Sequence, residues 1–297
     1  FHLCLSLVDM KDTSRISALI NLLDDPDELI FTQVSQELLS FGEHVVKDLE
    51  FAWENSFDEI LQLRIEQIIH QIQFQQVKKR LTEWKNGDTH SLLEAAIILT
   101  QYQYSELDEK EIHRTVENLY QQCWLEMNSD YTALEKAGVL NKVFFEINGF
   151  DGNRKDYNAP RKSYINNLLQ SKKGNPISIS MLYLELAERL KLPIYGVNLP
   201  EHFVVAYLVL PLKYLDTVDE ECILFYVDPF NKGALFQRND IEKYLTKLKI
   251  EKQEKFFMPC EKMTVVNRMI NNLIYGYHNN GKNDKVEELK ILKNCLK

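Results

Sequence analysis

Cysteine, glycine and proline are all scarce in this chain of 297 residues, which holds 5, 10 and 8 of them respectively. So little glycine and proline excludes collagen-like and low-complexity sequences. The five cysteines are odd in number and widely scattered, with no C-x-x-C pair and no Cys/His cluster at zinc-ligand spacing. We therefore expect no disulfide framework, no structural zinc and no cofactor.

Long apolar runs are also missing, since no window approaches the 18 apolar residues of a membrane span. Residues 1–12 include a short apolar run without a preceding basic residue or a small-residue cleavage pattern, unlike a signal peptide. We predict a reducing, cytoplasmic location. Because the chain starts at Phe1, the removal of an earlier leader stays open.

Positive charge is in deficit overall, because 35 Lys and Arg oppose 44 Asp and Glu for a net charge of −9. Such a balance disfavours nucleic acid as a partner. The deficit is confined to residues 1–147, with 12 basic and 26 acidic side chains, whereas residues 148–297 have 23 and 18. This contrast indicates two separately specified halves.

Residues 12–147 have helical periodicity almost throughout. The segment 58–61 repeats 27–30 at an offset of 31 residues, and apolar positions after each copy align: Val34 with Ile65, Leu38 with Ile69, Phe41 with Ile72. This weak repeat resembles a HEAT-type α-solenoid fragment. An irregular helical bundle is the alternative. Further helices are predicted at 91–101, 108–127 and 131–147.

A Gly/Asn/Asp cluster at 148–153 predicts a loop and the boundary between the halves. Two helices should follow, over 160–171 and from Pro176 to Leu190, the second with Asn175 as N-cap. β-Branched and aromatic residues then predict strands over 194–199, 202–210 and 222–228. A connection at 212–221, a helix at 240–248, and paired helices at 264–277 and 284–296 complete the expected order.

One group of residues within 148–297 has the arrangement of a catalytic site. A helix N-terminus favours the anion of a nucleophile, a histidine on a neighbouring strand can take its proton, and an aspartate on the next strand can orient the imidazole. His202 and Asp228 stand at these strand positions, after the helix that begins at Pro176. A lone core histidine and a strand-terminating aspartate are the alternative interpretation.

Short blocks in this order resemble the transglutaminase-like superfamily, with its Gly-x-Cys helix start, Gly-Ile-Pro turn, His strand and Asp-Pro strand end. They resemble most closely its transglutaminase-like plus TPR family, the bacterial "regulator of sirC expression" type. The blocks are 148–150 (NGF), 156–158 (DYN), 173–180 (KGNPISIS), 196–203 (GVNLPEHF) and 228–231 (DPFN).

The repeat and the resemblance together imply an α+β fold in three parts. These are an all-helical, HEAT-like region over 1–147, a papain/transglutaminase-like α+β core over 148–260, and a TPR-like helical hairpin over 261–297. A single TPR-type repeat cannot bury its own apolar face, so we expect it to dock on the rest of the chain or on a partner.

The sequence departs from the family at the nucleophile. Aligning Gly174 with the glycine of Gly-x-Cys puts Pro176 at the cysteine position, and no cysteine lies between residues 124 and 221. Cys222 starts the strand that ends in Asp228 and lies roughly 20 Å away at strand rise. Thiol chemistry is therefore not expected at this site.

Serine could substitute for the thiol, and Ser178 is two positions past the aligned site. We favour a capping role for it, because two helical residues turn a side chain about 200° around the axis. We expect Asn175, Pro176, Tyr157, Asn158 and Arg161 to line the cleft around His202 and Asp228. For the loop residues among them a solvated position is the alternative.

These observations favour a non-catalytic transglutaminase-like scaffold that binds protein partners through its helical-repeat surfaces. The alternative is a hydrolase or acyltransferase that uses the His202–Asp228 dyad with Ser178 or water. A third hypothesis, nucleic-acid binding, rests on a basic cluster that a solvated face explains better: Arg154, Lys155, Arg161, Lys162, Lys172 and Lys173.

Overall fold

A computed structural model describes residues 14–152, 155–156, 158–211 and 219–297. The described part of the chain folds as two compact units, which divide between Lys79 and Arg80. The domain boundaries predicted after residues 147 and 260 both lie inside the second unit. Among the described residues, no helix combines the length and the apolar character needed to cross a membrane.

The first unit is helical. After helical residues 14–20 it contains α2 (Glu28–Phe41), a 3-10 turn (Gly42–Val45), α3 (Val46–Glu54) and the start of α4 (Glu59–Asn86). Asp27 and Asp58 accept hydrogen bonds from the first N–H groups of α2 and α4, so the repeated segments 27–30 and 58–61 begin helices in the same way. A HEAT-type repeat stays a prediction.

Helix α9 (Pro176–Arg189) is the centre of the second unit, and almost all of its residues are buried. It packs against α5 (Leu92–Gln101), α6 (Glu109–Glu126), α8 (Ile165–Ser171) and α11 (Lys262–Asn279). Asn175 caps it and Pro176 occupies its first position, as predicted. Proline suits this position because the first helical N–H has no partner within the helix.

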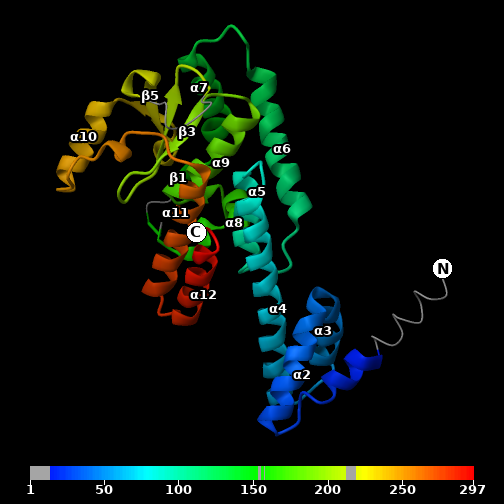
Figure 1. Cartoon of the computed structure of the whole chain (residues 1–297). Helices are drawn as coiled ribbons and strands as arrows, with labels where there is room; N and C mark the ends of the chain where they lie inside the picture. Colours follow the sequence, from blue (N-terminus) through cyan, green and yellow to red (C-terminus); the bar gives the residue numbers. More distant parts are fainter. Residues whose placement is uncertain (1–13, 153–154, 157, 212–218) are drawn as a thin grey trace. The chain divides into compact units, whose positions relative to one another are not determined.

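A four-stranded antiparallel sheet lies against α9. Its strands pair in chain order: β3 (Ile194–Val197), β4 (Val204–Leu208), β5 (Ile223–Asp228) and β6 (Ala234–Phe236). Helix α9 covers one face and α10 (Arg238–Lys247) the other, where Ile241 and Leu245 pack on Val204 and Ala206 (Figure 1). The fold is thus α+β, with a small sheet between helices.

A separate parallel pair joins β1 (Asp151–Gly152) to β2 (Lys173–Gly174) just before α9. β1 packs closely on the 3-10 turn Pro229–Asn231 that follows β5. A Cβ atom on Gly152 would lie 2.3 Å from the carbonyl oxygen of Phe230, so only glycine fits this contact.

Three predicted elements differ from the structure. β4 begins at Val204, so His202 lies in the turn before the strand and not within it. The helix predicted over 160–171 is a 3-10 turn (Pro160–Ser163) and α8, separated by extended Tyr164. Helix α7 (Ala133–Asn141) continues as a π-helical turn over Lys142–Ile147. The predicted connection at 212–221 lies mostly outside the described residues.

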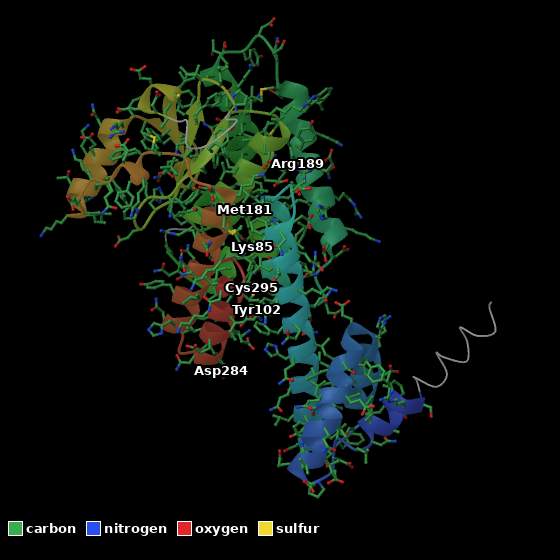
Figure 2. The ribbon with its side chains drawn as sticks, in the orientation of Figure 1. Lys85, Tyr102, Met181, Arg189, Asp284 and Cys295 are labelled. Carbon is green, nitrogen blue, oxygen red and sulfur yellow. The ribbon has the colours of Figure 1, made fainter. Side chains whose placement is uncertain are left out.

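Helix α11 and helix α12 (Asn283–Asn294) form the C-terminal hairpin, which docks on α5 and on the segment before α8. Tyr102 lies beside the end of α5 (Figure 2) and donates to Glu288 of α12 over 2.7 Å. Tyr164 and Tyr277 share a buried hydrogen bond of 2.8 Å. These two bonds fix the hairpin to its own chain. Its TPR character stays a prediction.

Candidate functional site

His202 and Asp228 lie next to each other because their strands are neighbours. Asp228 is the last residue of β5, His202 precedes β4 by two residues, and Val205 pairs with Val227 across the two strands. The His202 Nε2 lies 2.9 Å from Asp228 Oδ2, and the two side chains are only 17% and 11% exposed. Nδ1 is then the ring atom left to accept a proton from another group.

The Asp228 carboxylate is held by several donors. Oδ1 accepts the backbone N–H groups of Phe230 and Asn231 over 3.0 and 3.2 Å, and Oδ2 accepts the Asn231 side-chain amide over 2.5 Å. Burial by itself would raise the pKa of this carboxyl, but the bonds and charge from His202 and the Asn231 donors outweigh it, so the pKa is lowered. Asp228 is therefore an anion that can orient and stabilise the imidazole.

The turn that carries His202 is fixed by side chains from three helices. Tyr244 on α10 donates to the Pro200 carbonyl over 2.9 Å, and Arg268 on α11 donates to the Leu199 carbonyl over 3.3 Å. Buried Ser180 on α9 donates to the Phe203 carbonyl over 3.3 Å. Glu201 within this turn takes a left-handed backbone conformation with φ of 57°. The imidazole is thus preorganised from several sides.

A cavity of about 390 Å³ opens beside the imidazole, and we call it the His202 cavity. The ring of His202 makes an edge contact with Phe230 and a tilted contact with Tyr244, with centroids 5.9 and 6.2 Å away. The residues that line it are Pro176, Glu201, His202, Asp228, Phe230, Asn231 and Tyr244. The imidazole therefore shares its cavity with Pro176, at the position where the sequence alignment puts the nucleophile.

The polar side chains at the start of α9 are engaged with one another. The Ser178 hydroxyl donates to the Lys162 carbonyl over 2.7 Å and accepts the Asn175 N–H over 3.0 Å. Asn175 in turn accepts the Ser178 N–H and donates to Ser163. Both residues are buried and neither lines the His202 cavity. Their geometry is that of a helix cap, with the Ser178 oxygen used three times over.

Other predicted cleft residues lie elsewhere. The Asn158 carbonyl packs against Gly276 of α11, where a Cβ would come within 2.6 Å of it. Arg161 is exposed and 3.9 Å from the Asp156 carboxylate. Tyr157 and Arg154 lie outside the described residues. Two members of the basic cluster are already occupied: Lys173 pairs with Asp151, and Lys172 stacks over a phenylalanine ring.

The described cysteines lie away from the His202 cavity. Cys222 donates its S–H to Asp219, and Cys260 lines a second cavity beside β3. Cys123 is buried, and burial raises the pKa of its thiol to about 12. None of the residues that line the His202 cavity is a cysteine.

A group of possible metal ligands lies on α5 and α6. Atoms of Glu94, Glu109 and His113 come within 4.8 Å of one another. Arg80, however, binds both oxygens of Glu109 over 2.8 and 3.1 Å, so its guanidinium already supplies the positive charge there. The group fits an ion-pair network better than a cation site.

Four cavity residues were not foreseen as site residues. Glu201, Phe230 and Asn231 belong to the segments GVNLPEHF and DPFN, so a signal for them was present beside His202 and Asp228. Tyr244 comes from α10, sixteen residues after Asp228, and no local pattern connects it with the histidine. Its position depends on how α10 packs on the sheet.

Comparison with known proteins gives one family. A family model described as "Transglutaminase-like superfamily" matches residues 110–271, more than half of the chain. The UPF0162 protein of Xylella fastidiosa (strain 9a5c) is 28% identical over 206 residues, which cover 67% of this chain and 69% of that protein.

Two further relatives match shorter parts. A UPF0162 protein of Vibrio cholerae is 25% identical over 53% of this chain and 54% of its own length. Human F-box only protein 21 is 30% identical over 169 residues, 49% of this chain, but the match spans about a quarter (26%) of that protein. No solved structure matches the chain.

Proposed function

Since the chain belongs to the transglutaminase-like superfamily, we propose that it is a non-catalytic member that binds protein partners as a cytoplasmic scaffold. In this proposal it is of the "regulator of sirC expression" type, with HEAT-like and TPR-like helical surfaces beside the former active site. Its few, scattered cysteines support a reducing compartment.

One observation carries the proposal: the imidazole of His202 shares its cavity with the ring of Pro176 instead of a nucleophile. A proline side chain has no atom that can attack a carbonyl or lose a proton. The dyad geometry, with His202 held 2.9 Å from Asp228, supports descent from a catalyst. Without a thiol the dyad serves as a buried polar pair at the base of a binding cavity.

The test is turnover by the purified chain. We expect no hydrolysis or transfer with amide, peptide and ester substrates, and no difference between the parent chain and the His202→Ala variant. Turnover that His202→Ala abolishes would overturn the proposal. Circular dichroism and an unfolding midpoint of the variant show whether a loss of activity reflects a loss of the fold.

A second candidate is a hydrolase or acyltransferase that uses the dyad with Ser178 or water. The observation in its favour is an imidazole that an anionic Asp228 orients at a cavity, with an Nδ1 atom that no described residue bonds. Between its two nucleophiles the geometry favours water, because the Ser178 hydroxyl already donates to Lys162. Turnover that depends on His202 and survives Ser178→Ala would select the water form.

A further inference from the structure

Strand β3 is an outer strand of the sheet, and one of its edges faces away from β4. Its register pairs Ile194 with Tyr207 and Gly196 with Val205, and the Leu208 N–H bonds to the Pro193 carbonyl. Because hydrogen-bonded and non-bonded pairs alternate along an antiparallel ladder, Tyr195 and Val197 bond to β4. The peptide groups of Ile194 and Gly196 therefore point to the outer edge.

Two of the four outward groups are satisfied within the chain. The Ile194 N–H bonds to the Leu192 carbonyl over 2.8 Å, and the Gly196 carbonyl accepts the Cys260 N–H over 2.8 Å. No described residue bonds the remaining pair, which is one acceptor, the Ile194 carbonyl, and one donor, the Gly196 N–H. Unused groups of this kind on an outer strand can pair with an added strand.

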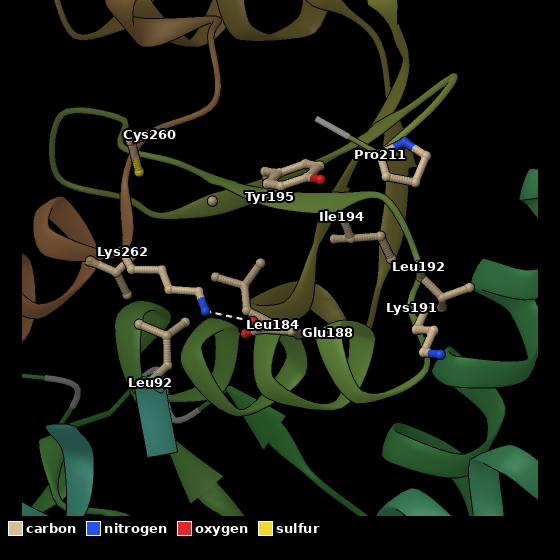
Figure 3. A pocket seen from close by; sticks show the side chains of 12 residues that line it. Leu92, Leu184, Glu188, Lys191, Leu192, Ile194, Tyr195, Pro211, Cys260 and Lys262 are labelled. Atoms are coloured by element: carbon tan, nitrogen blue, oxygen red, sulfur yellow. Dashed lines mark hydrogen bonds and ion pairs between the residues drawn. The ribbon is translucent and has the colours of Figure 1, made fainter. Parts of the chain in front are cut away.

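A cavity of about 420 Å³ lies along this part of the edge, between β3 and α9, and we call it the β3 cavity. Figure 3 shows Tyr195 and Ile194 above it, Leu184 of α9 below it, and Cys260 and Lys262 at the end toward which β3 runs. Leu92 and Val265 complete an apolar lining. The cavity can therefore bury an apolar side chain beside the two backbone groups.

The unused groups fix the direction of an added strand. In a parallel pair, one residue donates its N–H to the carbonyl before its partner and accepts the N–H after it. A residue opposite Tyr195 in a parallel strand would thus bond both the Ile194 carbonyl and the Gly196 N–H. An antiparallel strand would need all four outward groups, and two of them, the Ile194 N–H and the Gly196 carbonyl, are already bonded within the chain.

The same geometry fixes where the added strand ends. Two residues further along, a parallel strand would need the Gly196 carbonyl, which already accepts from Cys260. The added strand can therefore continue for one residue beyond the residue that lies opposite Tyr195. Alternate residues of a strand face opposite sides, so the side chain of that last residue points toward α9 and the apolar cavity.

Lys262 lies at the end of the cavity where the last residue would stop. Its ammonium group binds Glu188 of α9 over 2.5 Å and the Thr89 carbonyl over 3.3 Å, and a third N–H remains for another acceptor (Figure 3). The neighbouring Cys260 brings no negative charge, because burial raises the pKa of its thiol to about 12. A terminal carboxylate is the anion that a chain end supplies.

We propose that the outer edge of β3 binds the apolar C-terminal end of a partner polypeptide, extended parallel to β3. The penultimate residue makes both backbone bonds, the last side chain fills the β3 cavity, and the terminal carboxylate meets Lys262. This site goes beyond the proposed scaffold role by naming a partner chemistry, and it does not depend on the state of the His202 cavity.

Fluorescein-labelled decapeptides that end in two apolar residues, such as Val-Leu and Phe-Leu, test this site by fluorescence anisotropy with the full chain. We expect the free-acid peptides to bind about tenfold or more tightly than their C-terminal amides. N-methylation of the penultimate residue removes the donor to Ile194 and should weaken binding about tenfold. N-methylation of the last residue is the matched control, since that N–H points away from β3.

Substitution of Lys262 tests the carboxylate contact on the protein side. In Lys262→Gln the preference for free acid over amide should shrink several-fold, whereas Lys290→Gln, which breaks an exposed pair with Glu287 in α12, should keep it. The proposal is overturned if no free-acid peptide binds more tightly than about 1 mM. The proposal is also overturned if free-acid peptides and their amides bind with equal affinity, or if the two N-methylated peptides do. The readout is binding and not turnover, so these outcomes are separate from those of the His202 test.

Discussion

The His202 cavity and the β3 cavity divide between them the groups that a thiol catalyst combines. The first has an imidazole held by an anionic carboxylate, with Pro176 at the helix start. The second has the thiol of Cys260 among apolar side chains, and none of the described residues that line it is a histidine. The comparison teaches that the presence of His, Asp and Cys in a sequence does not predict a thiol catalyst unless the fold brings them into one cavity.

The two cavities also differ in what holds them in shape. Hydrogen bonds from α9, α10 and α11 fix the turn that carries His202. The β3 cavity is lined mostly by apolar side chains, together with the charged side chains of Glu188, Lys191 and Lys262. The first arrangement preorganises a side chain for chemistry, and the second suits the burial of a ligand.

The largest expected effect comes from putting the missing group back. Pro176→Cys places a thiol at the first position of α9 in the cavity of His202, where the helix terminus and the imidazole both favour the thiolate. We expect its pKa to fall about one unit or more below the ordinary value of about 8.5. Near neutral pH, iodoacetamide should then modify it about tenfold or more faster than Cys260, as followed by mass spectrometry.

The control for this variant is Pro176→Cys combined with His202→Ala. Loss of the imidazole should return the thiol pKa toward its ordinary value and slow the alkylation. A pKa near about 8.5 in both backgrounds would mean that residue 176 does not face the imidazole. The comparison of the two cavities would then lose its basis.

A smaller effect, on stability, should show whether Ser178 caps α9 or acts as a nucleophile. Ser178→Ala removes the cap oxygen that bonds Lys162 and Asn175, and we expect a loss of about 1–2 kcal/mol in the free energy of unfolding. Ser180→Ala loses one bond, to the Phe203 carbonyl, and should cost less. Urea unfolding of both variants measures this. A Ser178→Ala chain of unchanged stability would contradict the capping role and reopen Ser178 as a nucleophile.

The smallest effect is on the pH dependence of stability. Because folding lowers the pKa of Asp228, its contribution is complete above the ordinary Asp value of about 3.9 and is lost as the pH falls through the lower folded value. When the pH falls from 5 to 3, the free energy of unfolding of Asp228→Asn should therefore decrease by about 1 kcal/mol less than that of the parent chain. Asp88→Asn, which removes an exposed carboxylate outside the His202 cavity, is the control variant. Equal losses in Asp228→Asn and the parent chain would contradict the lowered pKa.

The local signals around α9 and the dyad were predictable from the sequence. Asn175 and Pro176 form a helix start by cap chemistry that acts within a few residues, and the structure has the helix there. β-Branched runs placed β3, β4 and β5 within a few residues of their bounds. His202 and Asp228 lie together because one precedes β4, the other ends β5, and these two strands are neighbours in the sheet.

Features that depend on tertiary packing were not predictable. The short strands β1, β2 and β6 have two or three residues each and leave no periodic pattern. The π-helical turn over 142–147 and the break at Tyr164 look like continuous helix in an apolar stripe. Tyr244 reaches the imidazole because α10 packs on the sheet, and the outer edge of β3 is set by strand order alone.

Gly152 sets a limit on how this molecule can diversify. The backbone of β1 touches the Phe230 carbonyl, and the N–H of the same Phe230 bonds the carboxylate of Asp228. Any larger residue at position 152 has to displace the loop that fixes this carboxylate. In a library randomised at positions 152 and 176 and selected for folding, glycine should be recovered almost invariably at 152. Position 176, whose ring lines the His202 cavity, should accept many residues, so a single tolerated substitution is enough to put a nucleophile beside the imidazole.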